Sequence, residues 1–189
     1  SVFFHRNPVQ ALLMLNTKYI IQNGILIKTE DEFGKKPLGN AWFVESLDTA
    51  NTTVKELNTL RSFFFDARTT AVINKNQLDY IQEFEYDPEG SIKLLSNKHN
   101  YIPNKLVYKS SAKAPQLAVF SEIFYPKGWN AYIDDMPVDY FCVNYLLRGL
   151  IIPEGEHEIL FEFNPKSFYV GNKIALSASI IFIITFFKP

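Results

Sequence analysis

The sequence contains a single cysteine, Cys142, so no disulfide can form within the chain. This excludes a small secreted module held together by disulfides, but it does not assign the protein to the cytosol. An excess of charge of one sign is also absent, since 19 basic and 20 acidic residues give a formal net charge of -1. Nucleic-acid-binding domains carry a basic face, so the charge balance argues against a nucleic-acid partner.

Sequence patterns for metals, cofactors and catalytic nucleophiles are missing as well. The three histidines, His5, His99 and His157, are far apart and have no close spacing with cysteine or carboxylates. The chain has no glycine-rich dinucleotide motif, no P-loop and no G-x-S-x-G motif. We therefore expect no cofactor, no metal site and no catalytic residue in this segment.

The first residues do not have the pattern of a signal peptide. Arg6 follows the apolar residues Val2, Phe3 and Phe4, whereas a signal peptide places its basic residues before a long apolar segment. An exported domain without its own signal has to be exported as part of a larger chain. We therefore interpret the sequence as a piece of a multi-pass membrane protein.

The chain does contain a long apolar stretch near its C-terminal end. Residues Ile174 to Phe187 include no charge over fourteen positions, or about 21 Å of helix, against about 30 Å for a bilayer core. The stretch is apolar on all sides, so a helix here offers no polar face to solvent. We expect residues 171–189 to be the start of a truncated transmembrane helix; a buried helix of a soluble protein is the alternative.

Aromatic residues make up 15% of the chain, which favours β-sheet, but the first part mixes helical and strand patterns. Helices are expected from Asn7-Pro8 and over Thr52–Leu60, where Glu56 lies at the capping-box distance from Thr53. The other expected elements are a hairpin of Lys18–Asn23 and Ile25–Lys28 about Gly24, a loop over Thr29–Gly39, and strands at Ala41–Glu45 and Thr69–Ile73. Together they predict a small α+β subdomain with a βαβ-like unit over residues 1–82.

From Gln82 onward the pattern is almost wholly β. In the last apolar run, Ile159 and Phe161 alternate with Glu158 and Glu162, as in a strand with one core face and one solvent face. The expected strands are Ile92–Leu95, Leu106–Tyr108, Leu117–Phe124, Trp129–Ile133, Leu146–Ile152 and His157–Phe163. We predict an antiparallel β-sandwich over residues 83–170, and an α+β, mostly β fold class for the whole chain.

Two local clusters invite a functional interpretation. Asp134-Asp135 resembles a metal-binding acid pair, but its place between two strand patterns favours a hairpin turn. The second cluster surrounds Ser121–Trp129, where an acid lies among aromatic residues. It supports sugar binding, in which rings stack on the sugar and the acid binds hydroxyls; aromatic packing of the core, with Glu122 facing water or paired with Arg148, is the simpler alternative.

Long stretches of the chain resemble one family. The most specific are SEIFYPKGWNAYIDDMPV (Ser121–Val138) and NYLLRGLIIPEGEHEILFEFNPKSF (Asn144–Phe168), which resemble the C-terminal region of the bacterial YfhO membrane-protein family. Three upstream pieces resemble the same family in the same order: LNTKYII (Leu15–Ile21), PLGNAWFV (Pro37–Val44) and FDARTTAVI (Phe65–Ile73). The resemblance covers nearly the whole chain and departs at Asp135, where Gly is expected.

This resemblance implies a large polytopic protein with the GT-C type of glycosyltransferase architecture. Such proteins transfer a sugar from a polyprenyl-phosphate carrier to an envelope polymer, with the catalytic acid in the first outward loop. No catalytic residue can therefore be carried onto this chain. The resemblance also implies that the N-terminal helix leaves a preceding membrane span and that Lys166 and Lys173 lie near the membrane interface.

We expect an extracytoplasmic accessory domain at the bacterial cytoplasmic membrane, next to the rest of its own transmembrane bundle, that positions a polyprenyl-phosphate sugar or an envelope glycan. Trp129 and Tyr132 are expected to stack on sugar rings, Arg148 to meet a phosphate or carboxylate, and Glu122 to bind hydroxyls. The alternative function is a structural or interaction domain, with an apolar patch and no affinity for glycans. A soluble lectin-like protein is a third option.

Overall fold

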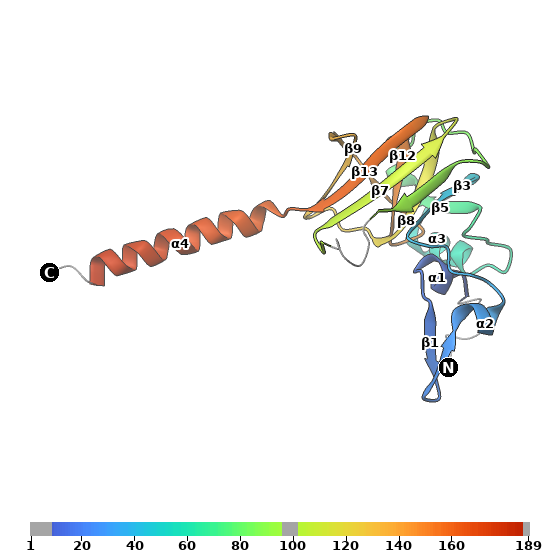
Figure 1. Ribbon diagram of the computed structural model, residues 1–189, viewed down its shortest axis with the longest axis horizontal. Helices are drawn as coiled ribbons and strands as arrows, with labels where there is room; N and C mark the ends of the chain where they lie inside the picture. The colour runs from blue at the N-terminus through green and yellow to red at the C-terminus, as the bar shows by residue number, and fades with distance from the viewer. Residues whose placement is uncertain (1–8, 96–101, 187–189) are drawn as a thin grey trace.

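The computed structural model describes residues 9–95 and 102–186 (Figure 1). The fold is mostly β, as predicted, and a five-stranded and a six-stranded sheet form a sandwich-like arrangement. A separate two-stranded hairpin and a long C-terminal helix project from the sandwich (Figure 1).

The six-stranded sheet combines strands from both halves of the chain. In spatial order it contains β3 (Ala41–Val44), β8 (Gln116–Ile123), β12 (Leu147–Ile152), β11 (Phe141–Val143), β5 (Thr70–Asn74) and β4 (Ser46–Ala50). All neighbours are antiparallel except β4 and β5. Strands from before and after residue 82 therefore share one sheet, so the predicted α+β and sandwich parts are joined through it.

The parallel pair is a βαβ unit, but its first strand is not the one predicted. Helix α3 (Thr53–Leu60) connects β4 to β5, whereas β3 pairs with β8 at the opposite end of the sheet. The sequence of β4 gives a weak signal because three of its five residues are exposed at a sheet edge. The helix is capped by Thr52, whose Oγ1 accepts the Lys55 N–H at 3.2 Å. Glu56 does not form the expected capping box, because its carboxylate accepts the Tyr145 N–H at 2.7 Å.

The five-stranded sheet contributes the other layer. Its order is β10 (Met136–Val138), β9 (Trp129–Ile133), β13 (Gly155–Phe163), β7 (Lys105–Ala112) and β6 (Ser91–Leu94). Its inner face packs on the six-stranded sheet through edge-to-face rings: Phe120 lies 4.9 Å from Tyr108 and 4.9 Å from Phe161, centroid to centroid. The opposite face of the six-stranded sheet is covered by a second apolar cluster that includes Met14, Leu60 and Phe65.

Two predicted hairpin turns are confirmed. β1 (Tyr19–Gln22) and β2 (Ile25–Lys28) meet at Asn23-Gly24, with φ of 52° and 80°. β9 and β10 meet at Asp134-Asp135, with φ of 49° and 66°. A two-residue turn with positive φ at both positions matches the twist of the strands and favours Asn, Asp and Gly. The Asp pair is therefore a turn, and Asp135 adopts the conformation without glycine.

The region predicted as a loop over Thr29–Gly39 begins with a short helix, α2 (Thr29–Phe33). Three acidic residues in its first turn complement the helix dipole, and Gly34 ends the helix in the left-handed conformation, with φ of 65°. The first helix, α1, spans Val9–Met14. Its predicted start at Asn7-Pro8 lies outside the described residues.

The C-terminal helix, α4 (Lys166–Phe186), has 21 residues, or about 31 Å at 1.5 Å per residue. None of the residues of α4 is buried in the described protein, so α4 is not a core helix of this domain. It is long and apolar enough to cross a membrane, with a mean hydropathy of 1.6. The helix is longer than the uncharged stretch because Lys166 and Lys173 are part of it.

Candidate functional site: an aromatic groove beside the C-terminal helix

A groove of about 620 Å³ runs between the β9–β10 edge of the five-stranded sheet and the 3-10 helix η2 (Lys75–Tyr80). This volume is in the usual range for a small-ligand site. Five aromatic side chains line the groove, namely Tyr80, Phe124, Trp129, Tyr132 and Tyr140. The polar side chains of Gln77, Asn130 and Asp139 lie among them. Aromatic faces with a few amide and carboxylate groups suit a ligand that has both apolar faces and hydroxyls.

Two of the predicted binding residues, Trp129 and Tyr132, line this groove. Both belong to β9, where side chains alternate between the two faces of the sheet. Trp129 shares the parity of the buried Ala131 and Ile133, and Tyr132 has the opposite parity. The two side chains therefore leave the strand on opposite faces of the sheet, and both line the groove at the sheet edge.

Arg148 lies in the core beneath Trp129 rather than in the groove. It is 2% exposed, with its guanidinium carbon 4.2 Å from the centroid of the Trp129 ring and 5.0 Å from that of Phe161. Its Nε donates to the Ile123 carbonyl at 3.1 Å, while its buried Nη1 has no hydrogen-bond partner in the described part of the chain. The expected contact with a ligand phosphate is therefore replaced by a contact that supports the Trp129 ring.

Glu122 owes its position to an irregularity in β8. The pairing of β8 with β12 shifts so that Leu147 faces Ile123 while Arg148 faces Phe120, which leaves Ser121 and Glu122 as extra residues. Such a bulge redirects side chains. Burial raises the pKa of Glu122, and the positive charge of Arg148 partly offsets the effect. Glu122 does not line the groove, so only Trp129 and Tyr132 of the four expected residues do.

Sequence reasoning missed Tyr140, which connects the groove to the core. Its hydroxyl donates to the carbonyl of Tyr125 at 3.2 Å or of Trp129 at 3.3 Å. Its ring packs against Phe124 and Phe161, with centroid distances of 5.3 and 5.4 Å. Burial raises the pKa of the Tyr140 hydroxyl, with Arg148 opposing the shift. No local pattern marks this residue, because its partners come from three separate segments.

The groove lies next to the end of the sandwich that leads into α4. Trp129 pairs with Phe163, the last residue of β13, and the two rings are 5.4 Å apart. The Asn164 N–H donates to the Gly128 carbonyl at 2.7 Å, which joins the groove wall to the connection before Lys166. The exposed Phe168 and Tyr169 follow in the first turn of the helix. Aromatic residues at this position are typical of a membrane–water interface.

Asp134, in the turn between β9 and β10, has a structural partner. Its Oδ2 lies 2.5 Å from His157 Nδ1, and its Oδ1 accepts the Glu158 N–H at 2.9 Å. These bonds lower the pKa of Asp134, and the same contact raises the pKa of His157. Within the described residues no group of three His, Cys, Asp or Glu side chains is arranged to hold a metal ion.

Comparison of the chain with protein-family models, with curated proteins and with solved structures finds no match. The groove, the buried residues that support it and the adjoining apolar helix are therefore the features from which a function can be inferred.

Proposed function

We propose that this chain is the extracytoplasmic domain of a polytopic membrane glycosyltransferase of the YfhO type, and that it binds a glycan in the aromatic groove. Its role is to position a lipid-linked sugar donor or an envelope-polymer acceptor beside the membrane. The domain itself supplies binding and orientation, because the groove holds aromatic and amide groups rather than an acid–base pair.

The observation that carries this proposal is the position of the aromatic groove at the α4 end of the sandwich. Trp129 contacts Phe163, and α4 begins three positions later at Lys166. If α4 crosses the membrane, a sugar in the groove lies close to the membrane surface, where the head group of a polyprenyl carrier is found. Lys166 and Lys173 would then extend toward the interface, as long basic side chains do.

Binding is best tested with Tyr132, because Trp129 is also a packing residue. Trp129 contacts Arg148 and Phe163, so its replacement also disturbs the core. Tyr132 lines the groove and belongs to neither buried apolar cluster. The matched control is Tyr86→Ala, which removes an exposed tyrosine that does not line the groove.

The measurement is an NMR titration of the full chain with chitobiose and with a short-chain prenyl-phosphate glucose. The detergent should be a polyoxyethylene ether, since a maltoside head group is itself a sugar. We expect saturable shifts at Trp129, Tyr132 and Tyr140, about tenfold weaker binding in Tyr132→Ala, and unchanged binding in Tyr86→Ala. A folded protein that shows no shift with about millimolar ligand contradicts the proposal.

Exposed apolar side chains favour a second candidate, a domain that docks against other protein segments of the membrane assembly. Phe63 is 84% and Phe64 is 93% exposed, and in the β1–β2 hairpin Ile21 is 77% and Leu26 is 64% exposed. A lone two-stranded hairpin is marginally stable in water, and large exposed apolar groups mark interaction sites. With the domain and its transmembrane bundle expressed as separate polypeptides, Phe63→Ser/Phe64→Ser should reduce their co-purification and leave glycan binding intact; unchanged co-purification contradicts this role.

A further inference from the structure

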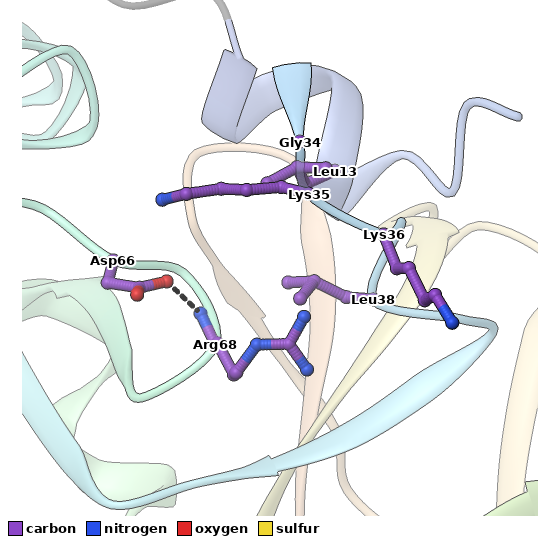
Figure 2. A pocket seen from close by; sticks show the side chains of 7 residues that line it. All are labelled: Leu13, Gly34, Lys35, Lys36, Leu38, Asp66 and Arg68. Atoms are coloured by element: carbon purple, nitrogen blue, oxygen red, sulfur yellow. Dashed lines mark hydrogen bonds between the residues drawn. The ribbon is translucent and has the colours of Figure 1, made fainter. Parts of the chain in front are cut away.

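A second pocket, of about 290 Å³, lies among α1, the segment after α2 and the loop before β5. Its apolar floor is formed by Leu13 and Leu38, and its charged groups belong to Lys35, Lys36, Asp66 and Arg68 (Figure 2). The volume is at the lower end for ligand pockets, which suits a small polar head group. The pocket shares no lining residue with the aromatic groove.

The loop that carries Arg68 is held by buried hydrogen bonds. The N–H of Ala67 donates to Gln10 Oε1 at 3.1 Å, and its carbonyl accepts the Trp42 Nε1–H at 2.8 Å. Gln10 is 2% exposed, so this anchor is shielded from water. The Arg68 N–H also donates to Asp66 Oδ1 at 3.0 Å (Figure 2). The backbone beneath the Arg68 side chain is therefore fixed before any ligand arrives.

The segment carrying the two lysines is also tied to the domain. Gly34 adopts the left-handed conformation that ends α2 and turns the chain toward the pocket. The Leu38 N–H then donates to the Leu13 carbonyl at 3.1 Å. Lys35 is thereby placed on one side of Leu38 and Arg68 on the other, while the Lys36 side chain points away from the other charged groups (Figure 2).

The charges of this pocket are less fully paired than those on and beside β7. On and beside β7, three lysines are each paired with an acid: Lys105 with Glu162, Lys109 with Glu156, and Lys113 with Glu89. In the pocket Lys36 pairs with Glu30 at 3.6 Å, but among the described residues neither Lys35 nor Arg68 has an acidic side-chain partner. Two unpaired cations above an apolar floor favour an anion, and a guanidinium with an ammonium suits a phosphoryl group.

We propose that this pocket binds the phosphoryl group of a water-soluble, hydroxyl-bearing ligand such as a sugar phosphate. Arg68 and Lys35 hold the phosphate oxygens, and Asp66 Oδ2 accepts a ligand hydroxyl. Figure 1 places α1 and α2 on the side of the sandwich away from the start of α4, so the pocket is remote from the point where α4 leaves the domain. This site shares no lining residue with the groove, so it does not depend on glycan binding there.

The test is an NMR titration of the full chain in a polyoxyethylene detergent with glucose 1-phosphate and with inorganic phosphate, at constant ionic strength. We expect saturable shifts of the Lys35, Leu38, Ala67 and Arg68 amides, with glucose 1-phosphate binding more tightly because of Asp66. The double variant Lys35→Gln/Arg68→Gln should bind at least about tenfold more weakly. The matched control Lys109→Gln/Lys113→Gln changes the net charge equally but alters only surface ion pairs, so its binding should be unchanged.

Three outcomes would overturn the assignment. Equally weakened phosphate binding in the two double variants, both still folded by circular dichroism, would mean that binding depends only on the net charge of the protein and not on this pocket. Absence of saturable shifts with either phosphate would show that the pocket binds no phosphoryl group. Shifts that occur only when phosphatidic acid is added to phosphatidylcholine nanodiscs containing the chain would assign the pocket to a lipid head group instead of a soluble ligand.

Discussion

Replacement of the buried Arg148 by methionine should leave the protein at least as stable as it is now. The guanidinium is buried between the sheets, its Nη1 lacks a partner in the described part of the chain, and Glu122 forms no direct ion pair with it there. Methionine is also unbranched, although shorter than arginine, adapts to irregular space and makes favourable contacts with aromatic rings. The Arg148→Met variant therefore fills most of the space of the side chain and removes its charge.

The magnitudes favour the apolar side chain. Burying a charge without a direct partner carries a penalty of several kcal/mol, about the same as the stabilisation from its contacts. The cation–π contact with Trp129 contributes about 2 kcal/mol, and the hydrogen bond to the Ile123 carbonyl about 1.5–3 kcal/mol. We expect Arg148→Met to leave the free energy of unfolding unchanged or to raise it by about 1–4 kcal/mol. Arg148→Ala should lower it by about 2–5 kcal/mol, because a cavity remains beneath Trp129.

The assay is urea unfolding of the full chain in non-ionic detergent, followed by tryptophan fluorescence. Both tryptophans report on packing, since Trp42 is buried and Trp129 contacts the substituted position. Met and Ala variants that lose the same stability would refute the reasoning, because the charge rather than the volume would then be the stabilising feature. Weaker glycan binding in a fully stable Arg148→Met variant would show that Arg148 orients the Trp129 ring.

Three further predictions concern pH, packing and the membrane. The contact with Asp134 raises the pKa of His157 above 6.5 and lowers that of Asp134 below 3.8. On the His157 side, the stabilisation from this contact is complete below pH 6.5 and is lost as the pH rises through the raised pKa of His157 in the folded protein. On the Asp134 side, the stabilisation is present above pH 3.8 and is lost as the pH falls through the lowered pKa of Asp134. NMR titration of Asp134→Asn should therefore return the His157 pKa toward 6.5. Gly149→Ala should destabilise the sandwich by about 1–3 kcal/mol in urea unfolding, because the new Cβ would lie 2.5 Å from a buried ring carbon, whereas Gly171→Ala meets no atom within 4 Å. Leu176→Arg, at the centre of α4, should disfavour membrane insertion by about 3 kcal/mol and reduce the carbonate-resistant fraction.

Each of these predictions has a clear contrary result. An unchanged His157 pKa in Asp134→Asn would mean that the hydrogen bond to the Glu154 carbonyl, rather than Asp134, keeps the pKa raised. Equal stability of Gly149→Ala and the parent chain would show that β11 moves aside without penalty. Full membrane retention of Leu176→Arg would mean that α4 does not cross the bilayer.

The sequence by itself determined the features that depend on neighbouring residues. Alternation over His157–Phe163 identified β13, and Asn23-Gly24 and Asp134-Asp135 identified the two turns. These signals are local because φ preferences and side-chain alternation act within a few residues. The apolar character of α4 on all sides was equally visible, although only the structure gave its full length from Lys166.

Tertiary structure alone decided how these pieces meet. The sequence assigned the first strand of the βαβ unit to residues 41–45, because the exposed β4 has no apolar alternation of its own. It placed Arg148 at a ligand, because it could not reveal that the bulge in β8 and the Trp129 ring enclose the guanidinium. Tyr140 and the pocket beside Arg68 were missed for the same reason. Their contacts join segments that are distant along the chain, and such pairing is set by packing of the whole fold rather than by local propensity.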